Sequence, residues 1–266
     1  MHPFLNIATE AARKAGALLE RYYQRLDQLT VEEKGPNDFV SEADRRAEAI
    51  IVDTIHKYYP DHSIIAEEGH GERTDAEVEW IIDPLDGTTN FLHGFPHFAV
   101  SIAVREKGRL THGVIYDPLR DELFAASKGE GARLNNVRIR VSERKKLEHA
   151  LLATGIPYRE FDYVDSYMQS LRYFMMNTAG IRRPGSAALD LAYTACGRVD
   201  GYWEFNLRPW DIAAGAIIVR EAGGIVTDFA GGDNYLNSGN ILAANPYLIR
   251  EMARVIARTI PEEYRK

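Results

Sequence analysis

The spacing of apolar residues changes period along this chain, and no fold built only of helices or only of strands accommodates the change. Near the amino terminus, apolar residues recur at steps of three and four, which predicts an amphipathic helix over residues 4–25. A second helix is predicted over 42–58, with Ser41 as its N-cap. Beyond this helix the apolar runs become short and β-prone, which is typical of strands.

The remaining chain predicts a series of strands, followed by strands that alternate with helices. Lys107-Gly108, between two of the predicted strands, is typical of an antiparallel hairpin turn. Because both halves contain strands and helices, we expect an α/β fold in which sheets are layered with helices. The predicted strands lie at 63–66, 78–83, 97–105, 110–116, 121–126, 150–154, 200–205 and 225–228, and the further helices at 162–178, 186–196, 211–222 and from Asn245 onward.

Length and composition indicate the number of domains and exclude some kinds of binding site. The chain has 266 residues, about 1.8 times a typical domain, and it contains no repeat or linker. We therefore expect one domain over 1–266, with soft internal halves at about 1–145 and 146–266. The net charge of −7 argues against a broad nucleic-acid-binding surface. Because Cys196 is the only cysteine, an intrachain disulfide and a cysteine-based zinc site are excluded.

The chain carries no signal for export or for a membrane span. Its first residues, MHPFLNIATEAARKAG, contain neither a charged segment followed by an apolar one nor a small-residue cleavage site. There is no apolar run of about 18 residues anywhere. We expect a soluble, cytoplasmic protein that makes no membrane contact.

The stretch at 80–91 is the most informative about chemistry. The three apolar residues at 80–82 predict a strand that is buried on both faces and ends at Asp83. A carboxylate at that point costs free energy unless it is paired or binds a metal. The turn that follows can bring Asp83, Asp86 and the carbonyl of Leu85 together, and three oxygens suit a hard cation.

The residues after Asp86 suit a phosphate. Gly87 lets the backbone approach a ligand closely, and residues 88–90 can begin a short helix whose free N–H groups point at an anion. The alternative is that Asp86-Gly87 is only a hairpin turn. Two acids on either side of Pro-Leu, directly after an apolar strand, favour the site.

Further acids stand where strands end or helices begin. Glu67 follows the apolar run at 63–66, although a Glu pair before glycine is also typical of a solvated loop. Asp211 stands at the start of a predicted helix, where an N-cap would explain it equally well. Asp44 lies three residues after Ser41, which is the pattern of a capping box.

Four of these acids would repel one another if they were gathered together without cations. Two or more Mg²⁺ would supply the missing charge, and two metals bridged by a phosphate are typical of enzymes that displace a group at phosphorus. The four acids are Glu67, Asp83, Asp86 and Asp211. Their spacing leaves open whether they converge.

Two motifs identify a resemblance to a known family. DPxDGTxNF occupies Asp83–Phe91 and WDxAAG occupies Trp210–Gly215, in this order and about 120 residues apart. The chain resembles, over essentially its whole length, the inositol monophosphatases, which are Mg²⁺-dependent and lithium-sensitive phosphatases. The resemblance implies a layered α-β-α-β-α sandwich of the inositol monophosphatase and fructose-1,6-bisphosphatase type, and a homodimer.

The resemblance also implies a set of ligands for two to three Mg²⁺. Glu67, Asp83 and the carbonyl of Leu85 would bind the first ion. Asp83, Asp86 and Asp211 would bind the second, and a weaker third ion would lie near Glu67.

Catalytic and substrate-binding residues are implied in the same way. Thr88 and Asp44 match the pair that positions and deprotonates the attacking water, and Glu67 is the third catalytic candidate. The backbone amides of Gly87 and Thr88 would hold the phosphate. The residues implied in substrate binding are Lys34, Asp86, Gly87, Thr88, Gly185, Ser186, Ala187, Glu204 and Asp211. Ser186 stands where animal members have threonine, so we expect a modest change in sugar preference.

The resemblance leaves several substrates open. Enzymes of the same fold act on fructose 1,6-bisphosphate, 3′-phosphoadenosine nucleotides, NADP or histidinol phosphate. The run from Gly185 to Ala187 together with Glu204 favours myo-inositol monophosphate.

A function of a different class is implied by a closer resemblance, at 97–105 and 182–193 among other stretches, to a bacterial branch of the family. Members of that branch act in transcription antitermination on ribosomal RNA operons, where they contact RNA polymerase and Nus factors. A short basic segment would aid such contacts, although a solvated face is the preferred interpretation. Its members are Arg138, Arg140, Arg144, Lys145 and Lys146.

Overall fold

The structure, a computed structural model, describes residues 2–35, 38–157 and 161–265, and their side chains except at 28, 33–35 and 38–40. The helices are α1 (Pro3–Tyr23), α2 (Glu42–His56), α3 (Thr88–Leu92), α4 (Val164–Asn177), α5 (Ala187–Ala195), α6 (Pro209–Glu221), α7 (Tyr235–Ser238) and α8 (Ile249–Thr259). Short 3₁₀ helices lie at Leu26–Gln28, Leu147–His149 and Glu262–Tyr264.

The strands form two large sheets and one separate hairpin. They are β1 (Val31–Gly35), β2 (Asp38–Ser41), β3 (Ser63–Ala66), β4 (Val78–Asp86), β5 (Ala99–Glu106), β6 (Arg109–Asp117), β7 (Glu122–Ser127), β8 (Gly131–Leu134), β9 (Val137–Arg138), β10 (Leu151–Thr154), β11 (Gly180–Arg182), β12 (Gly201–Glu204), β13 (Ile225–Thr227) and β14 (Ile241–Ala244). The larger sheet has the order β3-β4-β5-β6-β7-β8-β9, and the smaller one has the order β11-β10-β12-β14-β13.

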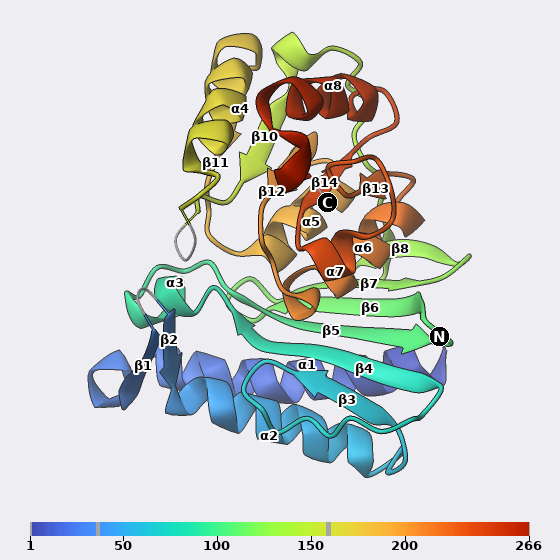
Figure 1. Ribbon diagram of the computed structural model, residues 1–266. Coiled ribbons are helices and arrows are strands. Elements are labelled where there is room, and N and C mark those ends of the chain that lie inside the picture. Colours follow the sequence, from blue (N-terminus) through green and yellow to red (C-terminus); the bar gives the residue numbers. More distant parts are fainter. Residues whose placement is uncertain (1, 36–37, 158–160, 266) are drawn as a thin grey trace.

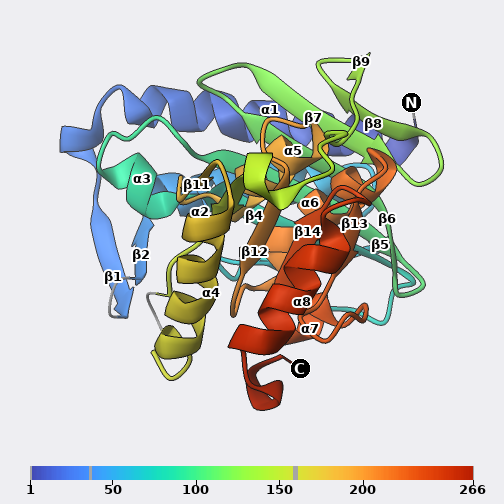
Figure 2. The ribbon, with the colours of Figure 1, turned by 90° about the horizontal axis from the view of Figure 1, so that it is seen from above.

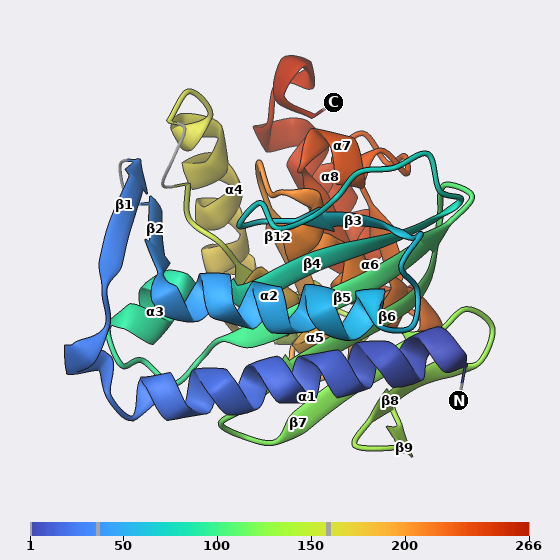
Figure 3. The same cartoon turned by 90° about the horizontal axis from the view of Figure 1, so that it is seen from below.

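Helices and sheets stack in five layers, which confirms the predicted α-β-α-β-α sandwich (Figure 1). Helices α1 and α2 lie side by side across one face of the seven-stranded sheet (Figure 3). Helices α5 and α6 fill the space between the two sheets (Figure 1). Helices α4 and α8 cover the outer face of the five-stranded sheet and lie toward the viewer in Figure 2. Three apolar clusters join the layers, and each contains residues far apart in the chain.

A bulge in β4 is the feature of the fold that matters most for chemistry. The sequence predicted that this strand ends at Asp83, but it continues to Asp86 through an irregularity in its pairing. Asp83 pairs with Ser101, and Asp86 pairs with Ala99. In a regular strand, residues three apart point to opposite faces. The extra residue restores the alternation, so both carboxylates lie on the face that packs against α6.

The prediction of the last helix is wrong at its start. Asn245 does act as a cap, but of the turn before the helix: its Oδ1 accepts hydrogen bonds of 2.9 Å from the amides of Tyr247 and Leu248. Helix α8 begins only at Ile249. Several strands were not predicted, because they are four residues or shorter or lack an alternating pattern; they are β1, β2, β8, β9, β11 and β14.

Within the described ranges, none of the helices has both the length and the apolar character that crossing a membrane requires.

Candidate active site

One cavity of about 630 Å³ collects acids from separate parts of the chain. Glu67 follows β3, Asp83 and Asp86 lie on either side of the β4 bulge, and Asp211 lies in the first turn of α6. Leu85 also lines this cavity. The four acids that the sequence left unconnected therefore border one space between the two sheets.

Asp83 lies at the centre of this acidic cluster. Its side chain is buried, and burial is the main reason that its pKa lies well above the usual value of a carboxyl. The charges of Glu67, Asp86 and Asp211 raise the pKa further, and a hydrogen bond with Glu67 favours the protonated form. Such mutual repulsion is what a bound cation would relieve.

Asp86 connects the cluster to the first turn of α5. Its Oδ2 accepts hydrogen bonds from the hydroxyl of Ser186 and, at 2.8 Å, from the amide of Ala188. Burial outweighs the opposing effect of these donors and raises the pKa of Asp86 to about 6. Ser186 is also the N-cap of α5, since its hydroxyl accepts a hydrogen bond from the amide of Leu189.

Asp44 serves as a cap and also reaches the cavity wall. Its Oδ2 accepts hydrogen bonds of 2.8 and 2.5 Å from the amide and hydroxyl of Ser41, which completes the predicted capping box of α2. Its Oδ1 accepts a hydrogen bond of 3.1 Å from the Thr88 hydroxyl, which also lies 3.0 Å from the Leu85 carbonyl. Burial raises the pKa of Asp44 above its usual value. The two alternatives weighed for Asp44, cap and site residue, are thus compatible.

Gly87 is the N-cap of α3, so the alternative that Asp86-Gly87 forms a hairpin turn is wrong. Its φ of 95° lies in the left-handed region that favours glycine. A Cβ at this position would lie 3.0 Å from the carbonyl oxygen of His97 and 3.3 Å from that of Gly185. A side chain would therefore be strained in its backbone and crowded against two other loops.

The loop that carries Glu67 is held in place by Glu48, a buried acid on α2. Glu48 accepts hydrogen bonds of 2.6 Å from the amide of Glu68 and 2.8 Å from the amide of His70. The ring Nδ1 of His70 also lies 2.8 Å from the Glu48 carboxylate. Glu67 and Glu68 are only partly exposed, so this segment is a fixed loop rather than the freely solvated one considered from the sequence.

Asp211, like Asp44, takes part in a helix cap, and it also lies at the cavity. It is the third residue of α6, and its Oδ2 accepts a hydrogen bond of 2.7 Å from the amide of Arg208. It also borders the cavity and raises the pKa of Asp83. The helix begins two residues earlier than predicted, at Pro209.

The same cavity contains the residues that the resemblance implies for the polyol. Gly185, Ser186, Ala187 and Glu204 all line the cavity. Burial raises the pKa of the Glu204 carboxyl to about 8, against the effect of a hydrogen bond from Tyr202. The side chain of Lys34 falls outside the described residues.

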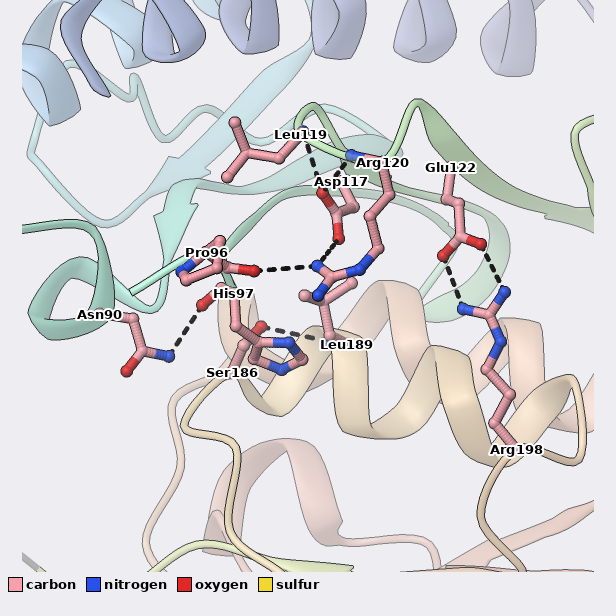
Figure 4. Close-up of polar contacts among 10 residues, drawn as sticks. All are labelled: Asn90, Pro96, His97, Asp117, Leu119, Arg120, Glu122, Ser186, Leu189 and Arg198. Atoms are coloured by element: carbon pink, nitrogen blue, oxygen red, sulfur yellow. Dashed lines mark hydrogen bonds and ion pairs between the residues drawn. The ribbon is translucent and has the colours of Figure 1, made fainter. Parts of the chain in front are cut away.

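Arg183 and Asn90 are among the cavity residues that were not predicted as part of the site. Arg183 is exposed, and it is the only Lys or Arg among the described residues that line the cavity. Asn90 donates from Nδ2 to the carbonyls of His97 and Pro184 at 2.8 and 2.9 Å, and Figure 4 shows its side chain turned toward His97. Asn90 belongs to the first motif, which is the signal that could have identified it.

The donor set fits a hard divalent cation. All candidate ligands are oxygens, namely the carboxylates of Glu67, Asp83, Asp86 and Asp211 and the carbonyl of Leu85. Within residues 2–35, 38–157 and 161–265, no three Asp, Glu, His or Cys side chains are already gathered at one point. The evidence that these residues fit a cation is that they border the same cavity and that the neighbouring acids raise the pKa of Asp83.

The basic segment lies away from this cavity and is solvated. All five side chains are exposed. Arg144 forms an ion pair of 3.1 Å with Asp200, and Lys146 lies 3.3 Å from Glu148.

Comparisons with known proteins agree on one family. The family model described as the inositol monophosphatase family matches residues 1–263. The chain is 55% identical over 253 residues to Nus factor SuhB of Escherichia coli (strain K12), which covers 95% of each protein. The solved structure of extragenic suppressor protein suhB from Bartonella henselae matches with a TM-score of 0.94 at 47% identity, over 97% of this chain and 100% of that one. Inositol monophosphatase from Anabaena matches with a TM-score of 0.83 at 41% identity, over 98% and 97%.

Proposed function

Because this chain belongs to the inositol monophosphatase family, we propose that it is a Mg²⁺-dependent phosphatase that hydrolyses myo-inositol monophosphate to inositol and phosphate. The observation that carries this proposal is the cavity in which an oxygen-only cluster of four acids lies beside the Thr88–Asp44 pair. Acids that line a cavity, with a hydroxyl at its wall that donates to a buried carboxylate, suit the transfer of a phosphoryl group to water.

Two to three Mg²⁺ would be held by the acidic cluster. Glu67, Asp83 and the Leu85 carbonyl would bind the first ion and a weaker third near Glu67, whereas Asp83, Asp86 and Asp211 would bind the second. When bound, Mg²⁺ lowers the pKa of water and stabilises negative charge on the phosphate and the departing oxygen.

The Thr88–Asp44 pair would handle the proton of the attacking water. The Thr88 hydroxyl donates to Asp44, so its oxygen can accept a hydrogen bond from a water molecule in the cavity. As the water attacks phosphorus, its proton passes to Thr88 Oγ1 while the Thr88 proton passes to Asp44. The raised pKa of Asp44 makes it a better base for this step than an exposed carboxylate.

Further residues of the cavity, together with Lys34, would bind the substrate. The amides of Gly87 and Thr88 would hold the phosphate, and Arg183 would attract it to the cavity. Gly185, Ser186, Ala187 and Glu204 would contact the hydroxyls of the polyol, with Asp86, Asp211 and Lys34 completing the set.

The test is phosphate release from D,L-inositol 1-phosphate by the purified protein, with and without Mg²⁺ and with a parallel lithium series. We expect release that requires Mg²⁺ and is inhibited by millimolar lithium. Fructose 1,6-bisphosphate, 3′-phosphoadenosine nucleotides, NADP and histidinol phosphate should be ranked beside it by kcat/KM. A strong preference for one of these would replace the proposed substrate, and release without metal would overturn the mechanism.

A second role is favoured by the relatives named Nus factor, which align over 95% of this chain at 55% identity. We propose that the protein also binds the transcription machinery, through RNA polymerase or Nus factors. A pull-down against the elongation complex should compare wild type with Asp83→Asn. Equal capture of both would show that the role is independent of catalysis, and capture of neither would refute it.

We further propose a homodimer, as the family resemblance implies. Sedimentation at several protein and Mg²⁺ concentrations tests this, and a single monomeric species throughout would refute it.

A further inference from the structure

Glu204 is placed at the cavity wall by the pairing of two strands. Strands β10 and β12 are parallel, with Thr154 paired with Trp203, so the next residues along, Gly155 and Glu204, lie side by side. Thr154 fixes this end of the pair, since its hydroxyl donates a hydrogen bond of 2.8 Å to the Trp203 carbonyl. Both Gly155 and Glu204 line the cavity.

The absence of a side chain at Gly155 makes room for the Glu204 carboxylate. A Cβ at this position would lie 1.8 and 2.2 Å from the two carboxylate oxygens. Atoms cannot approach that closely, so any side chain here would displace the end of Glu204. The φ of Gly155 does not lie in the left-handed region, so the backbone itself accepts alanine. The need for glycine at this position therefore comes from Glu204.

Tyr202 also holds this carboxylate, through a hydrogen bond. It lies two residues before Glu204 in β12 and hence on the same face of the sheet. Its buried hydroxyl donates a hydrogen bond of 2.5 Å to Glu204 Oε2. With Gly155 leaving space and Tyr202 supplying a donor, the carboxylate has one defined orientation beside the cavity.

We propose that Gly155 and Tyr202 are positioning residues that set the selectivity for polyol phosphates, because together they hold the Glu204 carboxylate where it accepts hydrogen bonds from the substrate hydroxyls. This inference rests on the proposed function. It separates recognition of the polyol hydroxyls, which involves Glu204, from the phosphate chemistry, which involves the acidic cluster and the Thr88–Asp44 pair.

The test compares two substrates in variants of the full chain. Inositol 1-phosphate carries hydroxyls for Glu204, whereas p-nitrophenyl phosphate carries none. Gly155→Ala and Tyr202→Phe should each raise KM for inositol 1-phosphate about tenfold or more. Their kcat/KM for p-nitrophenyl phosphate should stay within about twofold of wild type. In a Glu204→Ala background, Gly155→Ala should add no further loss, because the group that it displaces is absent.

Gly180→Ala is the matched control. Gly180 lies in β11 of the same sheet, and a Cβ there would have its nearest neighbours at ordinary contact distances of 3.5 and 3.6 Å. This variant should behave as wild type with both substrates. Thermal denaturation checks that each variant is folded, and a crystal structure of Gly155→Ala should show that Glu204 has left the Tyr202 hydroxyl.

The outcomes separate this inference from the proposed function. If wild type hydrolyses inositol 1-phosphate and both variants match it, the inference is wrong and the function stands. An equal loss with both substrates would show that the two residues are merely structural and would also overturn the inference. The same conclusion follows if the losses of Gly155→Ala and Glu204→Ala multiply in the variant that carries both. If wild type cleaves p-nitrophenyl phosphate but not inositol 1-phosphate, the proposed substrate is wrong and the inference falls with it. Should Gly155→Ala not fold, Tyr202→Phe decides.

Discussion

Thr88, the first residue of α3, donates a hydrogen bond of 3.1 Å to Asp44 on α2, although the two residues are 44 positions apart. The contact joins the first turn of α2 to the start of α3, at the wall of the cavity that Thr88 lines. Each partner has a second anchor, since Thr88 also contacts the Leu85 carbonyl and Asp44 is held by Ser41. The pair is therefore pre-oriented before substrate binds.

Removing either member of this pair should abolish most of the turnover. Thr88→Ala and Asp44→Asn are each expected to lower kcat by about 10²–10⁴-fold, because the water loses its path for proton transfer. The double variant should be no slower than the worse single one, since the two residues act as a unit. Ser41→Ala should have a smaller effect on kcat, because the amide of Ser41 still donates a hydrogen bond of 2.8 Å to Asp44. By weakening the helix cap it should lower the free energy of unfolding by about 1 kcal/mol. A Thr88→Ala enzyme with near-normal kcat would contradict the assignment.

Asp83→Asn should stabilise the metal-free protein while it abolishes activity. Burial and the neighbouring acids raise the pKa of Asp83, so a neutral amide removes an unfavourable charge and should raise the free energy of unfolding by about 1 kcal/mol. With Mg²⁺ the order should reverse, because wild type gains about 2.7 kcal/mol at a metal concentration of 100 Kd. Thermal denaturation with EDTA and with MgCl₂ measures both. Equal stabilisation of wild type and variant by Mg²⁺ would refute the ligand assignment.

Glu48 should control metal affinity without touching the metal. It holds the amides of Glu68 and His70, so Glu48→Ala releases the loop that carries Glu67. We expect the Mg²⁺ concentration for half-maximal activity to rise about 10–100-fold, with a smaller rise for Glu48→Gln, which keeps one accepting oxygen. Isothermal titration of Mg²⁺ provides a measure that is independent of turnover. Unchanged Mg²⁺ binding in Glu48→Ala would show that the loop does not depend on this contact.

His97 should make the protein less stable in mild acid. Burial and, to a smaller extent, the charge of Arg120 lower the pKa of His97 to about 4. Its Nε2 has no hydrogen-bond partner among the described residues. Figure 4 shows its ring beside α5, on which Tyr193 lies at a ring distance of 5.9 Å. Below pH 6.5 the unfolded chain binds a proton that the folded chain excludes, so stability is lost as the pH falls from 6.5 toward 4.

His97→Phe removes the imidazole that takes up this proton in the unfolded chain. The loss of stability in wild type between pH 8 and pH 5 should exceed that of the variant by about 2 kcal/mol. Urea denaturation at the two pH values measures the difference. Parallel curves for the two proteins would show that His97 is not the group responsible.

The chemistry of the acidic cluster was readable from the sequence, because it depends on local pattern. The apolar run before Asp83 and the first motif placed two acids and a glycine at the end of a buried strand. The same local signals predicted the capping box of Ser41 and the turn at Lys107-Gly108, where both residues have positive φ. Helices α1, α2, α4, α5 and α6 were predicted for the same reason, since their apolar period is set by neighbouring residues.

What only the tertiary structure decided is how these residues meet. The β4 bulge turns Asp83 and Asp86 to one face, and no local signal gives the register of β4 against β5. The pairing of β10 with β12 sets Gly155 beside Glu204 across 49 positions in the chain, through contacts that form only when the whole sheet assembles. Local pattern determined which residues can do chemistry, because a turn, a cap or a period depends on neighbours. Long-range packing determined which of them act together, because register and layer order depend on the entire core.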